Sequence, residues 1–205
     1  MPDGDIKTVE ELVDHYGEPQ GHLARKEKPE LNHHCRRFLE LSSFCVLSTS
    51  AAGDGPADCS PRGDAPGFIH VIDDTTIAIP DRPGNRRTDT FHNIMENPEI
   101  AVMFMVQGLN EVLRLNGRAR LTTDEKLLGK MIANGKPPRA ALVIDIRHVY
   151  FHCGKAIIRA DLWNPDNQVQ KRDFPTLGKI NQDWYGVDAD EVDAKLANDY
   201  KNNLY

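Results

Sequence analysis

The stretch of this chain that says most about its fold reads Thr76-Ile77-Ala78-Ile79-Pro80-Asp81-Arg82-Pro83-Gly84-Asn85-Arg86-Arg87. Its first part is an apolar run typical of a buried strand, and the rest is a Pro/Gly turn that carries three arginines. Guanidinium groups bind phosphate oxygens in pairs, and glycine lets backbone N–H groups approach an anion. The stretch therefore predicts a strand that ends at a phosphate site. A solvated basic loop, paired with Asp81 and Asp89, explains it equally well.

A second loop of similar chemistry follows another candidate strand and reads Asp58-Cys59-Ser60-Pro61-Arg62-Gly63-Asp64. Ser60 offers a hydroxyl, Arg62 a guanidinium and Gly63 a turn. Two such loops favour a shared anion, because each charge-assisted hydrogen bond to a phosphate contributes roughly 1.5–3 kcal/mol. We expect Asp64, Asp81 and Asp89 to orient the arginines rather than to act as bases. The loops would anchor the tail of a nucleotide while apolar walls hold its ring.

The composition narrows the possible partners. A chain of 205 residues is long enough for one domain with appendages. Its formal net charge of -6 argues against nucleic acid as the main partner. No apolar run approaches the roughly 20 residues that span a bilayer, and the acidic residues 1–5 lack the apolar region of a secretory signal. We therefore expect a cytoplasmic protein with no membrane partner.

The cysteines and histidines predict neither disulfides nor a metal site. The four cysteines lie far apart and show no C-x-x-C spacing, so reduced thiols are expected. Histidines occur in His33-His34-Cys35 and His152-Cys153, but neither has the i, i+4 spacing of a helical zinc site.

The hydrophobic pattern changes period at residue 43. Before it we expect helices, the first capped by Thr8 with Glu11 and another opened by Asn32. Strands are expected over 44–49, 56–60, 67–72, 76–79, 100–106, 111–121 and 140–152, and helices over 22–28, 88–96 and 123–133. The tail after Trp163 is polar and weakly helical near 190–200. About six strands with helical insertions indicate a small antiparallel barrel.

Five motifs in fixed order carry a resemblance to a known family. They are Ser60-Pro61-Arg62-Gly63-Asp64 with Pro66-Gly67-Phe68, Ile79 to Arg87 with Asp89 and Asn93-Ile94, Leu113-Arg114-Leu115-Asn116-Gly117-Arg118-Ala119, His152-Cys153-Gly154-Lys155-Ala156, and Arg159 with Leu162-Trp163. The chain resembles the pyridoxamine 5'-phosphate oxidase-like FMN-binding split-barrel superfamily, in particular a bacterial branch of FMN-dependent enzymes. The resemblance runs from about residue 10 to 165.

The resemblance implies a six-stranded antiparallel split β-barrel, mainly β with helical additions, that forms a homodimer. Residues 1–42 would be an N-terminal helical segment, 43–163 the FMN-binding barrel and 164–205 a polar extension, all within one structural domain. Two FMN sites would lie at the subunit interface.

Within such a site, the resemblance implies that Arg62 and the loop residues Asn85, Arg86 and Arg87 hold the phosphate. Strand 111–115, with Arg114, would lie beside the flavin ring. Lys155 and Trp163 are candidates from the partner subunit, although a salt bridge for Lys155 and a dimer contact for Trp163 explain them equally. The cofactor-binding candidates are therefore Ser60, Arg62, Gly63, Asp81, Arg82, Asn85, Arg86, Arg87, Arg114, Lys155 and Trp163.

The resemblance also implies a flavin-dependent oxidoreductase that acts on a small molecule. No side-chain nucleophile is required, because the flavin carries the chemistry. The alternative is a non-catalytic flavin-binding carrier, sensor or scaffold. Oxidation of pyridoxamine phosphate itself is not expected. Glu111, Val112 and Leu113 stand where true oxidases carry a glutamine near the flavin, and the Arg/His substrate motif after Trp163 is missing.

Overall fold

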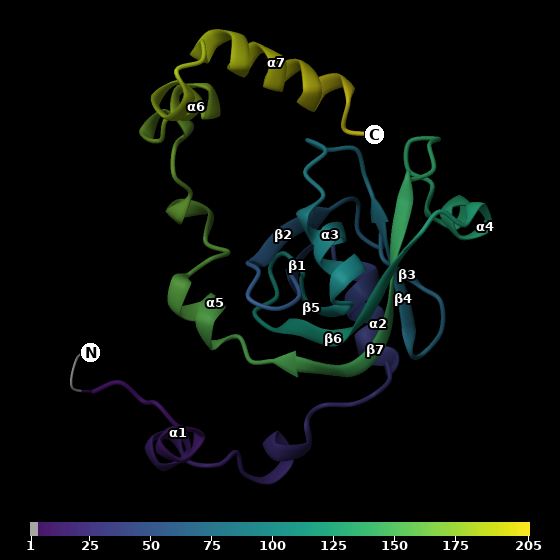
Figure 1. The fold of residues 1–205 in the computed structure, drawn as a ribbon, viewed down its shortest axis with the longest axis vertical. Coiled ribbons are helices and arrows are strands. Elements are labelled where there is room, and N and C mark those ends of the chain that lie inside the picture. Colours follow the sequence, from purple (N-terminus) through teal and green to yellow (C-terminus); the bar gives the residue numbers. More distant parts are fainter. Residues whose placement is uncertain (1–3) are drawn as a thin grey trace.

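The computed structural model describes residues 4–205 of the chain. Its centre is one antiparallel sheet of seven strands in the order β2-β1-β5-β6-β7-β4-β3 (Figure 1). The strands are β1 Phe44–Ser50, β2 Ala57–Gly63, β3 His70–Val71, β4 Thr76–Asp81, β5 Glu99–Met105, β6 Val112–Thr122 and β7 Ala140–His152. The fold is thus mainly β with helical additions, as the sequence predicts.

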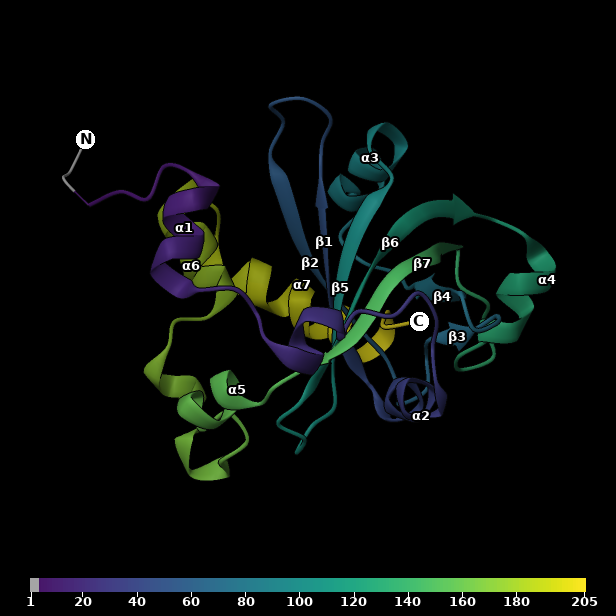
Figure 2. The same cartoon turned by 90° about the horizontal axis from the view of Figure 1, so that it is seen from below.

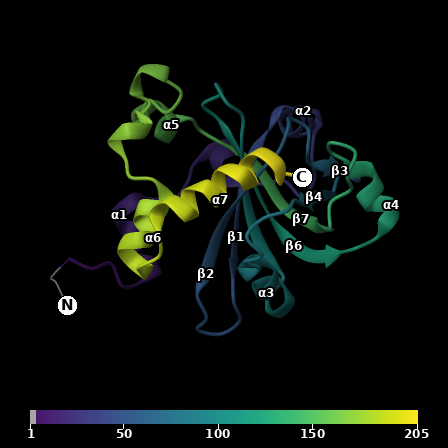
Figure 3. The ribbon, with the colours of Figure 1, turned by 90° about the horizontal axis from the view of Figure 1, so that it is seen from above.

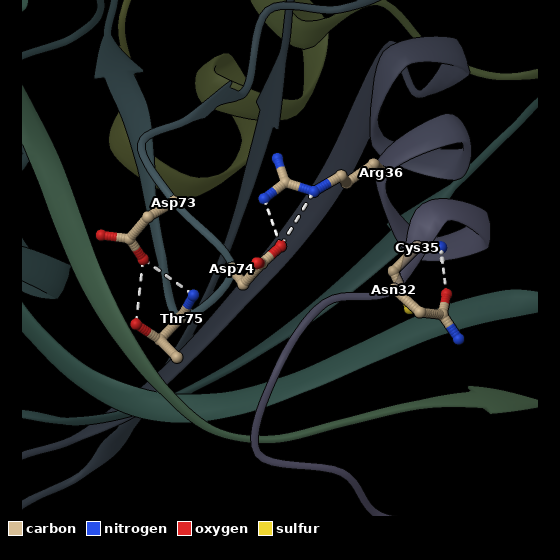
Figure 4. A network of polar contacts seen from close by, with 6 residues as sticks. All are labelled: Asn32, Cys35, Arg36, Asp73, Asp74 and Thr75. Atoms are coloured by element: carbon tan, nitrogen blue, oxygen red, sulfur yellow. Dashed lines mark hydrogen bonds and ion pairs between the residues drawn. The ribbon is translucent and has the colours of Figure 1, made fainter.

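The six strands that the resemblance implies are one too few, because the strand expected over 67–72 joins the sheet as a short edge strand. This strand, β3, holds two residues and pairs with β4 from His70↔Ala78 onward. The Asp73 carboxylate holds the turn by accepting hydrogen bonds from the N–H and hydroxyl of Thr75, at 2.8 and 2.9 Å (Figure 4). Aspartate favours such turns because its side chain reaches the backbone two residues on.

The helices are α1 Val9–Tyr16, α2 His33–Leu41, α3 Asp89–Glu96, α4 Glu125–Leu128, α5 Lys155–Ala160, α6 Leu177–Tyr185 and α7 Ala189–Asn202. Four 3₁₀ turns join them: η1 Gly21–Arg25, η2 Gly129–Met131, η3 Pro165–Asn167 and η4 Lys171–Asp173. The capping box of Thr8 and Glu11 opens α1 as predicted. The helix expected over 123–133 ends early, at the poorly helix-forming Gly129, and the one expected over 22–28 is only the turn η1.

The core fills the inside of the curved sheet. Alternate residues of the strands face inward, as the pleat dictates, and the most deeply buried are Cys45, Leu47, Ile77, Ile79, Phe104, Leu113, Leu115 and Ile144. Strands β2 and β3 stand at the two ends of the strand order. No hydrogen-bonded pairing joins these two ends, so the curved sheet stays open. Its open side lies between β2 and the part of β4 that extends beyond β3.

Helix α2 closes one end of this core. Asn32 caps the helix by accepting a hydrogen bond from the Cys35 N–H at 2.9 Å. Cys35, Phe38 and Leu39 form its buried side, whereas Leu41 at the end of the helix is exposed. Arg36 pairs with Asp74 in the β3–β4 turn and so ties the helix to the sheet edge (Figure 4).

A β-bulge in the β6–β7 pairing requires a glycine. The register shifts between Asn116 and Gly117. A Cβ at Gly117 would lie 2.3 Å from the Asp145 carbonyl oxygen, so no larger residue fits without moving the backbone. The bulge bends the two longest strands and lets the sheet curl.

Several helices lie outside the barrel. Figure 2 shows α1, α5 and α6 on one side, away from β3, β4 and α4, and Figure 3 shows α7 crossing back toward the barrel. Helices α6 and α7 pack on each other, where the Gly178 N–H donates to Asp193 Oδ1 at 2.8 Å. The sequence pattern predicts only the second of these two helices. No helix within residues 4–205 is long and apolar enough to cross a bilayer.

Candidate functional site

Two strand ends meet at the open side of the barrel. Arg82, directly after β4, donates from Nε to Oδ2 of Asp64, directly after β2, at 2.6 Å. The side chains are 15% and 3% exposed, so the pair is largely buried. Tyr205 Oη donates to the other carboxylate oxygen of Asp64, also at 2.6 Å. The ion pair joins the end of β2 to the loop after β4, the two segments that the sequence predicts to share an anion. The first of them, expected as a loop, is part of β2 as far as Gly63.

The Asp64 carboxylate is held in its charged form. Burial acts to raise its pKa, but hydrogen bonds from Tyr205, the Ala65 N–H and Arg82 outweigh burial and lower the pKa below its usual value. The ion pair is therefore intact at neutral pH. Asp64 orients Arg82, whereas the sequence predicts that it orients the phosphate-binding arginines.

Arg62 lies on β2 at the same opening. Its Nη1 donates to Ser60 Oγ at 2.6 Å and to the Pro61 carbonyl oxygen at 2.8 Å. Its guanidinium carbon lies 5.9 Å from the ring centroid of Phe91 on α3. These partners are neutral, and Arg62 forms no ion pair with any residue of 4–205. Its charge is available to an anion.

A shallow cleft continues from Arg62 toward β4. It is lined by Leu47, Arg62, Ile79, Pro80, Asp81, Phe91 and Leu142. Burial raises the pKa of Asp81, while the charges of Arg62 and Arg139 oppose this shift. Within the described chain Asp81 has no arginine at ion-pair distance. It therefore orients no arginine by a direct ion pair, which is where the expectation for this residue is wrong.

The loop after β4 is shaped by its own side chains. The Asn85 side-chain oxygen accepts a hydrogen bond from the Arg87 N–H at 2.9 Å. Arg86, between them, has a left-handed backbone with φ of 65°, which costs a non-glycine residue about 1–3 kcal/mol. Arg87 pairs with Asp89 at 2.8 Å in an exposed salt bridge. In residues 4–205 Arg86 has no ion-pair partner.

The remaining candidates lie elsewhere on the chain. Arg114 is on β6, with its guanidinium carbon 5.2 Å from the ring centroid of Tyr150. Lys155 is exposed at the start of α5. Trp163 donates from Nε1 to the Leu109 carbonyl oxygen at 2.8 Å. Helix α5 lies on the far side of the barrel from β4 (Figure 1). A single chain thus brings Ser60, Gly63, Arg62, Asp81 and Arg82 together but leaves Lys155 and Trp163 apart from them.

Sequence reasoning missed three residues at the opening. Lys136 and Arg139 approach it from the loop before β7, and Tyr205 approaches it from the end of the chain. Tyr205 lies 141 positions from Asp64, and no spacing pattern links residues so far apart. The Pro137-Pro138 pair marks a rigid loop between Lys136 and Arg139 but gives no indication of what the loop contacts.

A family model described as pyridoxamine 5'-phosphate oxidase matches residues 31–153, more than half of the chain. The chain belongs to this family. The match contains the whole sheet and both arginine loops. Lys155, Trp163, α1 and the helices after Gly154 fall outside it.

Solved structures similar to this chain share little sequence with it. HupZ of Group A Streptococcus has a TM-score of 0.49 at 17% identity, covering 59% of this chain and 93% of HupZ. A Lactobacillus delbrueckii protein named for pyridoxamine 5'-phosphate oxidase has a TM-score of 0.48 at 16% identity, covering 61% and 98%. A FAD-binding protein of Mesorhizobium loti has a TM-score of 0.40 at 17% identity, covering 60% and 94%. Among curated proteins no match was found.

Proposed function

We propose that this protein binds FMN, with the phosphate held by Arg62, Asn85, Arg86 and Arg87. The observation that carries the proposal is that Arg62 and Arg86 have no carboxylate partner in the described chain. The buried Asp64–Arg82 pair holds the end of β2 next to the loop after β4. A doubly charged phosphate supplies the counter-charge that both guanidinium groups lack. Membership in the family supports a flavin as its carrier.

The other residues of the opening fit the rest of the cofactor. Ser60 is a neutral donor already oriented by Arg62. Asp81 would repel a phosphate, but a carboxylate accepts hydrogen bonds from hydroxyl groups, so it suits the ribityl chain. Arg82 is engaged by Asp64, which makes it a positioning residue for the loop in this proposal. Gly63 lies at the end of β2, where Phe44 pairs with it and the backbone turns into the loop.

In this proposal Arg114, Lys155 and Trp163 lie near the flavin ring rather than near the phosphate. A bound flavin would supply hydride or electron transfer, and the protein would supply position and electrostatics. Arg114 and Lys26 both lie against the Tyr150 ring, with the Lys26 Nζ 4.6 Å from its centroid. Positive charge of this kind stabilises a reduced, anionic flavin.

We expect the purified protein to be yellow and to release FMN on denaturation. An absorbance scan and mass spectrometry of the released ligand test this, and they separate FMN from FAD by mass. FMN is expected because the chain has no dinucleotide fingerprint. A colourless protein that also fails to bind added FMN would overturn the proposal.

The redox role is the second part of the proposal. We infer an oxidoreductase that acts on a small molecule, and the alternative is a carrier or sensor without turnover. Anaerobic mixing with NADH or NADPH, followed by air or a small acceptor, separates them. Loss and return of the flavin absorbance favours the enzyme. Bound FMN that none of a panel of donors reduces favours the carrier.

We expect a homodimer with the flavin sites between subunits. Helices α5 and α6 and the segment between them leave apolar side chains exposed, namely Ile158, Leu162, Val169, Phe174, Leu177, Trp184 and Tyr185. A second copy would cover such surface and bring Trp163 of the partner subunit to the ring. Sedimentation at low micromolar concentration tests the assembly. A stable monomer that retains FMN would contradict the shared site.

A hybrid dimer provides a sharper test of the shared site. One subunit carries Arg62→Ala and the other Trp163→Ala. In a shared site one pocket carries both defects and the other carries neither, so half of the FMN should bind at near wild-type strength. Two pockets that each show one of the two single defects, with neither at wild-type strength, would show that each site is built from one chain.

A further inference from the structure

Tyr205 is the point at which the helical tail returns to the barrel. Its hydroxyl donates to Asp64 Oδ1 at 2.6 Å, and its carbonyl oxygen accepts a hydrogen bond from Lys136 Nζ at 2.8 Å. The Arg82 guanidinium carbon lies 5.8 Å from the centroid of the tyrosine ring. Figure 1 shows the end of the chain between the loop after β4 and the loop before β7. One residue therefore bridges two loops of the barrel.

This contact borders an open cavity of about 240 Å³. Arg82 and Pro83 form one wall, Lys136 to Arg139 form the other, and Tyr205 spans them. The first wall leads directly into Asn85, Arg86 and Arg87. Removing the tyrosine would remove the contact that links the two walls.

The contacts of Tyr205 are few but strong. A phenol that donates to a carboxylate makes a charge-assisted hydrogen bond, which is about twice as strong as a neutral one. The helices that lead to it, α6 and α7, pack chiefly on each other rather than on the sheet. A segment held at its end by a small set of polar contacts opens locally at low cost compared with the core.

We propose that Tyr205 is a latch that closes the loop after β4 over the candidate phosphate site, so that FMN enters and leaves only when the latch is undocked. The part about FMN rests on the proposed function. The closing of the two loops does not.

The test compares Tyr205→Phe, which keeps the ring and removes the hydroxyl, with Tyr205→Ala in the full chain. Tyr200→Phe on the exposed face of α7 is the matched control. Hydrogen exchange is measured without FMN over residues 82–88 and 133–139, where the Lys136 N–H donates to the Ala133 carbonyl oxygen at 2.9 Å. We expect roughly tenfold faster exchange in Tyr205→Phe, at least as fast in Tyr205→Ala, and no change in the control. Unchanged exchange in both Tyr205 variants overturns the latch.

Stopped-flow binding of FMN gives the second readout. A latch slows entry and exit alike, so Tyr205→Phe should raise both rate constants roughly tenfold and leave the dissociation constant nearly unchanged. A weaker affinity with an unchanged entry rate would make Tyr205 a contact residue and overturn the latch. If no variant binds FMN, the proposed function fails, while the exchange data still decide whether the loops are latched.

Discussion

Replacing Asp64 with alanine is expected to lower the free energy of unfolding by about 3–5 kcal/mol. The substitution leaves the Arg82 guanidinium buried without its counter-charge, since its side chain is only 15% exposed. It also removes the acceptor of the Tyr205 hydroxyl. Breaking a buried pair costs more than the pair contributes, because the remaining charge cannot regain its water. Urea unfolding followed by circular dichroism measures the loss.

The Arg36–Asp74 pair is the matched control. It also joins elements far apart in sequence, but its side chains are 36% and 62% exposed, so Asp74→Ala should cost less than about 1 kcal/mol. If Asp64→Ala cost no more than Asp74→Ala, the Asp64–Arg82 pair would not hold the opening together.

The Asp64–Arg82 pair makes the stability of the protein depend on pH, and the direction of the effect follows from the pKa of Asp64. The pKa of Asp64 is lower in the folded protein than in the unfolded chain, where the pKa of an aspartate is about 3.9. Its contribution is therefore fully present above that value and is lost as the pH falls through the lower folded-state pKa. The stability difference between wild type and Asp64→Ala should stay constant near neutral pH and shrink in acid.

Local patterns predicted most of the barrel, because the apolar residues that mark a strand lie within the strand itself. The apolar run ending at Pro80, the cap at Asn32 and the capping box of Thr8 act within a few residues, and the structure confirms them. The strand expected over 67–72 is shorter than its sequence pattern suggests, because only His70 and Val71 pair with β4. Cys59 and Cys153 are exposed, because Cys59 occupies an outward-facing position on the edge strand β2 and Cys153 directly follows β7.

The residues of the candidate site that cluster in short motifs were predictable from the sequence. The residues that come from distant parts of the chain were not. The spacing of Arg62 and Arg86 indicated two converging loops, and the Asp64–Arg82 contact joins those loops in the structure. Tyr205 and Lys136 reach the same place through the tail and a proline loop, which carry no periodic signal. Only a folded chain reveals such partners.

Arg62→Ala and Arg86→Ala should each weaken FMN binding by about 1.5–3 kcal/mol, a loss of roughly 10- to 150-fold in affinity. Each change removes a guanidinium with no carboxylate partner in the described chain, so the phosphate loses a charge-assisted contact that nothing else replaces. Folding should be largely preserved for Arg86, which is exposed. Arg87→Ala should cost less, because the charge of Arg87 is already shared with Asp89.

Riboflavin is the control ligand. It lacks the phosphate, so its affinity should barely respond to these changes. Fluorescence titration of both ligands against each variant measures the difference. Equal losses for riboflavin and FMN would mean that these arginines contact the ring or support the fold, and the phosphate assignment would be wrong.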